Sequence, residues 1–78
     1  MAENSILIYP PGMEVVIKAI NICGYIEEVV ITHNNSVTYR ISYFLENTKE
    51  GVYCKEFELV PKKDIKKQSI GFKWLNNI

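Results

Sequence analysis

The chain has 78 residues, a hydrophobic fraction of 47% and equal numbers of acidic and basic side chains. This length fits one domain, residues 1–78, and leaves little room for a deep catalytic cleft. The composition excludes a wholly disordered chain, and two cysteines are too few for a secreted disulfide scaffold. No signal-peptide pattern opens the sequence, and its apolar runs are too short to span a bilayer. We therefore expect a cytoplasmic protein with reduced thiols.

The first predicted elements are short strands around a proline turn. After residues 6–9, the segment 10–12 (PPG) predicts a turn, because prolines cannot continue a strand ladder. Residues 13–20 follow with Met13, Val15 and Ile17 on one face, which is the pattern of a half-buried strand.

The next segment, YIEEVVIT at residues 25–32, predicts a strand with an irregularity. Ile26 is out of phase with Val29 and Ile31. A β-bulge at Glu27 and Glu28 would bring all three apolar side chains to the core. Such a bulge also bends the strand, as a small barrel requires.

The second half of the chain predicts three more elements. Residues 37–45 alternate after the turn signal HNNS, with Val37, Tyr39, Ile41, Tyr43 and Leu45 on one face and Thr38, Arg40, Ser42 and Phe44 on the other. A polar turn at 46–51 and a fourth strand at 52–59 follow. The proline-initiated segment 60–68 predicts one short helical turn, and residues 69–75 predict a fifth, shorter strand. These short strands predict an all-β barrel with its core at about 11–61 and the segment 62–78 packed on it.

The order of these segments resembles the SH3-like barrels, the superfold that includes SH3, Tudor and KOW-type domains. The resemblance covers roughly residues 11–61 and is carried by PGMEVVI, GYIEEVVI, VTYRISYF and CKEFELV. It implies a five-stranded SH3-like barrel with one short helical turn before the last strand. Small phage and prophage proteins of unknown function, YorP-like proteins among them, are similar. The abundance of Ile, Lys and Asn is typical of an A/T-rich bacterial or phage genome.

The chain departs from the ligand-binding patterns of these families. It lacks the ALYDY-like stretch and paired tryptophan of peptide-binding SH3 domains and the ordered aromatic cage of methyl-lysine readers. It also carries two acids where KOW domains have a basic, glycine-centred stretch. The resemblance therefore implies a fold and not a ligand.

Residues that could perform chemistry are few. Cys23, His33 and Cys54 are the soft metal ligands, and none is at close ligand spacing. A Cys–His pair lacks an orienting third group, and the adjacent acids Glu27 and Glu28 would point to opposite faces of a regular strand. We therefore expect no enzyme, no metal and no cofactor.

The aromatic residues are more informative. If Tyr39, Tyr43, Phe57 and Leu59 fill the barrel, the remaining aromatics of the strands face outward, where the C-terminal segment covers them or a partner binds them. Our leading hypothesis is a non-enzymatic protein-binding module, encoded by a phage or prophage, that inhibits or adapts a host factor or defence system. Its contact residues would be Tyr25, Glu27, Glu28, Arg40, Phe44 and Tyr53, with aromatic anchors and acids that complement a basic partner.

Two alternatives stay open. Residues 60–78 carry five lysines and one acid, whereas residues 1–59 carry four basic and eight acidic side chains. A nucleic-acid-binding barrel would use Lys62, Lys63, Lys66 and Lys67 on phosphates and Trp74 for base stacking. The acidic body opposes nucleic acid, and such lysines are commonly a solvated face. The third hypothesis is a homo-oligomeric structural protein.

Overall fold

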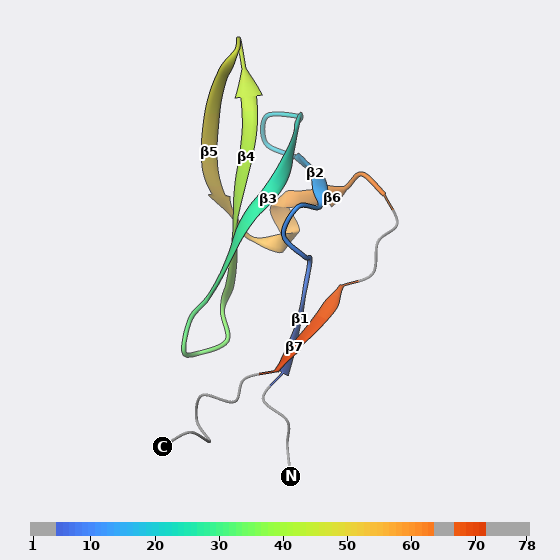
Figure 1. The fold of residues 1–78 in the computed structure, drawn as a ribbon, viewed down its shortest axis with the longest axis vertical. Helices are drawn as coiled ribbons and strands as arrows, with labels where there is room; N and C mark the ends of the chain where they lie inside the picture. Colours follow the sequence, from blue (N-terminus) through green and yellow to red (C-terminus); the bar gives the residue numbers. More distant parts are fainter. Residues whose placement is uncertain (1–4, 64–66, 72–78) are drawn as a thin grey trace.

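The computed structural model describes residues 5–63 and 67–71, and these form seven short strands (Figure 1). The elements in chain order are β1 (Ser5–Ile8), β2 (Glu14–Ile17), β3 (Ile22–Ile31), β4 (Val37–Leu45), β5 (Thr48–Cys54), the 3-10 turn η1 (Glu56–Glu58), β6 (Leu59–Pro61) and β7 (Gln68–Gly71). Five strands make one antiparallel sheet in the order β5-β4-β3-β2-β6. Strands β1 and β7 pair with each other in a separate ladder.

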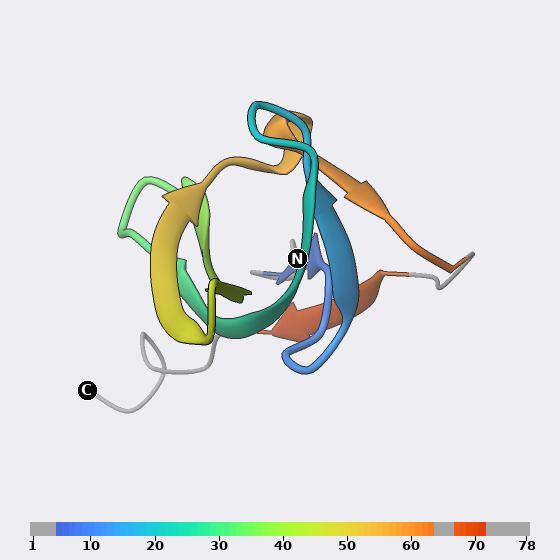
Figure 2. The ribbon, with the colours of Figure 1, turned by 90° about the horizontal axis from the view of Figure 1, so that it is seen from above.

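The five-stranded sheet curls around the core but does not close (Figure 2). Its edges are β5 and β6, and no ladder joins them within the described residues. Strand β6 has only three residues and ends in Pro61, which has no backbone N–H to donate. The predicted all-β fold of short strands is therefore confirmed, whereas a closed barrel is not what forms.

The helical turn lies earlier than the sequence pattern indicated. It is η1, and the carboxylate of Glu58 accepts a hydrogen bond from the Lys55 backbone N–H at 2.6 Å. Val60 and Pro61, predicted to begin the helical turn, belong to β6 instead. The last strand of the sheet is thus β6, while β7 pairs with β1. Residues 64–66 and 72–75 of the predicted turn and strand lie outside the described residues.

The same turn overturns one core assignment. Phe57, predicted to fill the barrel, is 75% exposed because η1 interrupts the strand alternation and directs the ring outward. Cys54 and Leu59, on either side of the turn, are buried. Leu45, predicted on the core face, is 47% exposed because it ends β4 at the tip of the β4–β5 hairpin (Figure 1).

The hairpin turn between β4 and β5 is shorter than predicted. Glu46 and Asn47 both have positive φ, 51° and 68°, which is the geometry of a two-residue hairpin turn. Residues 48–51, predicted as part of a polar turn, belong to β5. The longer strand extends the sheet over more of β4.

The core takes side chains from β1 and from every strand of the sheet. Its buried members are Ile8, Met13, Val15, Ile17, Ile26, Tyr39, Ile41, Cys54 and Leu59. Tyr39 is the largest, and its hydroxyl oxygen accepts a hydrogen bond from the Tyr9 backbone N–H at 3.0 Å. Burial raises the pKa of Tyr39, so the phenol stays neutral and its polar atom is satisfied inside the core.

Strand β3 contains the predicted bulge. Ile26 lies opposite Ile41 and Glu28 lies opposite Arg40, so the intervening Glu27 is an extra residue. Ile26 is fully buried, and Val29 packs against the core from the other side of the bulge. The predicted irregularity is confirmed. Because of the extra residue, Ile26 and Val29 both face the core.

Gly24 lies where β3 separates from β4. The ladder of β3 with β4 begins at Tyr25 and Ser42, whereas residues 22–25 pair with β2. A Cβ atom on Gly24 would lie 2.6 Å from the carbonyl oxygen of Ser42 and 2.9 Å from Cγ2 of Ile41. Only glycine permits this approach without moving backbone.

Gly24→Ala should therefore destabilise the fold by about 1–3 kcal/mol through overpacking, seen as a lower urea midpoint. Gly51→Ala is the matched control, because a Cβ atom there would meet only the flexible guanidinium of Arg40, no closer than 3.4 Å. We expect the control to change stability by no more than about 0.5 kcal/mol. Equal midpoints for the two variants would contradict this view of the strand separation.

Candidate functional site

The six predicted contact residues lie on one side of the sheet, opposite the core. We call this side the outer face; it includes Tyr25, Glu27 and Glu28 of β3, Arg40 and Phe44 of β4, and Tyr53 of β5. The strand register brings them together, because Glu28 and Tyr53 both lie opposite Arg40. Tyr25 lies opposite Ser42, one step further along the same face.

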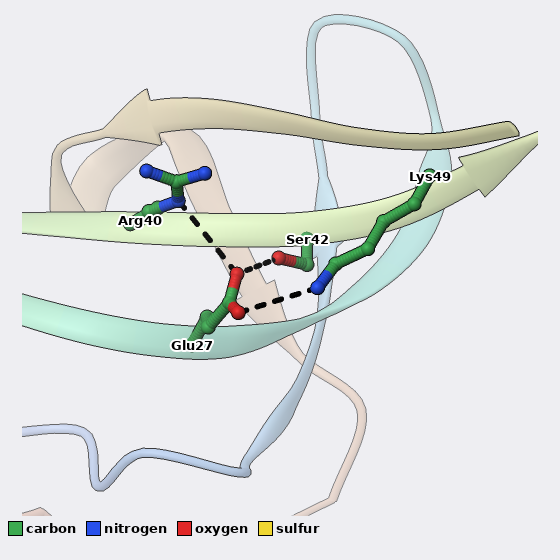
Figure 3. A network of polar contacts seen from close by, with 4 residues as sticks. All are labelled: Glu27, Arg40, Ser42 and Lys49. Atoms are coloured by element: carbon green, nitrogen blue, oxygen red, sulfur yellow. Dashed lines mark hydrogen bonds and ion pairs between the residues drawn. The ribbon is translucent and has the colours of Figure 1, made fainter.

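The carboxylate of Glu27 is the centre of a polar network on the outer face (Figure 3). Its Oε1 atom accepts a hydrogen bond from the hydroxyl of the fully buried Ser42 and lies 3.6 Å from Nε of Arg40. Its Oε2 atom lies 3.3 Å from Nζ of Lys49. The Ser42 hydrogen bond, followed by Lys49, lowers the pKa of Glu27, and Glu27 in turn raises the pKa of Lys49. The network is therefore ionised at neutral pH.

Arg40 is held between Glu27 and the ring of Tyr53. Its Cζ atom lies 5.8 Å from the Tyr53 ring centroid, within the range of a cation–π contact. Gly51 has no side chain to compete for the space next to the guanidinium. The Nε atom of Arg40 is buried and has no hydrogen-bond partner among the described residues, so its charge contact with Glu27 and the aromatic contact hold it in position.

Exposed aromatic side chains flank this network. Phe44 is 63% exposed and lies opposite Lys49 at one end, while Tyr53 is 57% exposed and lies opposite Arg40 at the other. Tyr25 is half-buried between them, on β3. The outer face thus presents aromatic surface on both sides of a fixed set of charges.

A groove opens on the outer face at the separation of β3 and β4. We call it the fork groove; it is lined by Glu14 of β2, residues 23–25 of β3 and residues 42–44 of β4. Its volume is about 230 Å³. Glu14 lies opposite Tyr25 in the β2–β3 ladder, so its exposed carboxylate borders the groove.

The structure describes three lysines of the predicted nucleic-acid set, Lys62, Lys63 and Lys67, and these differ in their surroundings. Lys62 and Lys63 are exposed after β6. Lys67 turns back to the body, with Nζ 2.5 Å from the Glu56 carboxylate and 5.3 Å from the Tyr9 ring centroid. Lys66 and Trp74, the other members of the predicted nucleic-acid set, lie outside the described residues.

Sequence reasoning missed several residues of the site: Glu14, Ser42, Lys49 and Gly51. Lys49 fell in the predicted six-residue turn, and the shorter turn is what places it opposite Phe44. Ser42 was on the correct face, but its contact with Glu27 depends on how the bulge directs the carboxylate. One signal could have found Lys49: it lies four residues before Tyr53, so both side chains share a face if the strand begins directly after a two-residue turn.

The residues considered for catalysis lie in different parts of the fold and differ in burial. Cys54 is buried, and burial, followed by the charge of Glu58, raises the pKa of its thiol. His33 is exposed in the turn after β3, and Cys23 is an exposed, free thiol in the fork groove. Within residues 5–63 and 67–71, no three His, Cys, Asp or Glu side chains gather as a metal site would require. In that same part of the chain, no helix is long and apolar enough to cross a membrane.

No protein-family model, no curated protein and no solved structure matches this chain.

The lowered pKa of Glu27 makes a pH prediction. Ionised Glu27 stabilises the fold above the carboxyl pKa of the unfolded chain, about 4.3, and this contribution is lost as pH falls through the lower folded value. We therefore expect Glu27→Gln to lower the urea midpoint by a constant amount near neutral pH. The difference from the wild-type protein should shrink below about pH 4.3. A difference that grows as the pH falls would contradict the network.

Proposed function

We propose that the protein is a non-enzymatic protein-binding module that contacts its partner through the outer face. The observation that carries this proposal is the exposure of Phe44 and Tyr53, 63% and 57%, on either side of a fixed charge network. Aromatic residues and arginine are enriched among the side chains that contribute most to binding.

The outer face is organised before a partner arrives. Glu27 holds Arg40 and Lys49 through ion pairs, and the Ser42 hydroxyl fixes the carboxylate from below. Side chains that are already ordered lose less conformational entropy on binding. A sheet face with its charged side chains already paired suits contact with a protein surface.

The charges of the outer face favour a basic partner. Glu27 is already compensated by two cations, so the acidic character offered to a partner comes from the exposed Glu14 and Glu28. Complementary charge sets the orientation and speed of association more than its final strength. The apolar contact would come from the aromatic side chains.

We also propose that the fold is an open member of the SH3-like barrels. Support comes from the meander of β2 to β5, the return of β6 beside β2, and the 3-10 turn that precedes β6. The phage or prophage origin, the cytoplasmic location and the inhibition or adaptation of a host protein stay predictions from the sequence. Fold alone does not identify a ligand.

Affinity capture with matched variants tests the binding proposal. Immobilised wild-type protein should enrich a specific protein from a lysate of the organism that encodes it, as measured by quantitative mass spectrometry. Tyr53→Ser should reduce that enrichment about tenfold or more, the effect of an aromatic anchor. Phe57→Ser is the control, because Phe57 is more exposed than Tyr53 but lies on η1. No enriched protein, or equal loss with both variants, would contradict the proposal.

Nucleic-acid binding is the second candidate, favoured by the exposure of Lys62 and Lys63. An electrophoretic mobility assay over a salt series separates it from protein binding. If the protein binds proteins and not nucleic acid, we expect no shift of DNA or RNA at physiological salt. Affinity that falls steeply with salt, and falls less steeply after Lys62→Ala and Lys63→Ala together, would support the nucleic-acid candidate instead.

A further inference from the structure

The fork groove is a consequence of strand separation. The ladder between β3 and β4 runs from the pair Tyr25–Ser42 to the pair Ile31–Val37. On the other side of Tyr25 and Ser42, β3 continues beside β2 and β4 continues beside β5, and the two diverge (Figure 1). Residues 22–24 and 43–45 therefore each have a ladder partner on one side, and the sides that face the groove are not joined to each other.

The size of the fork groove indicates what it can hold. Gly24 forms part of the lining without a side chain, at its close approach to the Ser42 carbonyl. The volume of about 230 Å³ is smaller than pockets for whole small-molecule ligands, which have roughly 300–1,000 Å³. One side chain of a larger ligand suits this groove better than a complete metabolite.

The lining of the groove selects a positive charge. Among the described residues that line it, Glu14 is the charged one, and Tyr25, Tyr43 and Phe44 are the aromatic ones. Aromatic faces carry negative potential and attract ammonium and guanidinium groups. Lys49 lies opposite Phe44, and its raised pKa comes first from Glu27, which pairs with its ammonium group at 3.3 Å, and then from Tyr25.

We propose that the fork groove binds a lysine or arginine side chain carried by an extended segment of the protein partner. An extended segment presents alternate side chains to one surface, so one of them can enter the groove while the others lie on the outer face. The basic side chain lies between Tyr25 and Phe44 with its charge at Glu14. This inference rests on the proposed function, because it names the chemistry of the partner at one part of the outer face.

Nuclear magnetic resonance titration with defined peptides tests the inference. The probes are four blocked heptapeptides of glycine and alanine that differ only at the central residue: lysine, arginine, norleucine or glutamate. The lysine and arginine peptides should shift the amide signals of Cys23, Gly24 and Phe44, and the other two should not. Glu14→Gln should weaken binding about fivefold, as expected for a lost charge contact, whereas Glu46→Gln, in the exposed turn between β4 and β5 and outside the groove, should not.

Two results would overturn the inference: equal shifts with the norleucine peptide, or a lysine-peptide affinity that Glu14→Gln does not change. Partner capture separates this failure from failure of the proposed function. If Tyr53→Ser loses the captured protein and Glu14→Gln retains it, the result supports binding through the outer face and contradicts the proposed groove contact. If the lysine peptide binds at the groove but no protein is captured, the result supports the groove as a site for a basic side chain and contradicts the proposed protein-binding function.

Discussion

Between Ile26 and Glu28, strand β3 holds one residue more than the stretch of β4 with which it pairs. A bulge of this kind increases the local twist and bend, and it shifts the side-chain phase by one position. Ile26 and Val29 can then both pack on the core although their spacing is odd. The extra residue, Glu27, is left over on the opposite side, where its carboxylate meets Ser42 and two cations. The curvature of the sheet and the charge pattern of its outer face therefore have one local cause.

The separation of β3 from β4 adds the second feature of the outer face. Gly24 allows the two strands to touch at the point where they part, and the fork groove opens just beyond. Tyr25 belongs both to the edge of this groove and to the aromatic surface around the network. A partner that covers Phe44 and Tyr53 would also reach the groove, so the proposed anchors and the proposed basic side chain belong to one contact.

Much of this arrangement could be predicted from the sequence, because apolar phase is a one-dimensional signal. The phase break around Glu27 indicated the bulge, and the alternation of residues 37–45 assigned the outward side chains. The exposure of Phe57 could not be read in this way, because the Glu58 carboxylate caps the Lys55 N–H and starts a 3-10 turn inside an apparently regular strand. The role of Lys49 was equally hidden, since the short turn before β5 has no glycine to mark it. Closure of the sheet depends on long-range geometry that no local pattern contains.

The strand register around Glu27 tests most directly whether the β3 bulge shapes the sheet and its outer face. Nuclear Overhauser effects between backbone protons of β3 and β4 report which residues lie opposite each other. The bulge predicts Glu28 opposite Arg40 and Val29 opposite Tyr39, with Glu27 opposite neither. A regular ladder, with Glu27 opposite Arg40 and Glu28 opposite Tyr39, would contradict it.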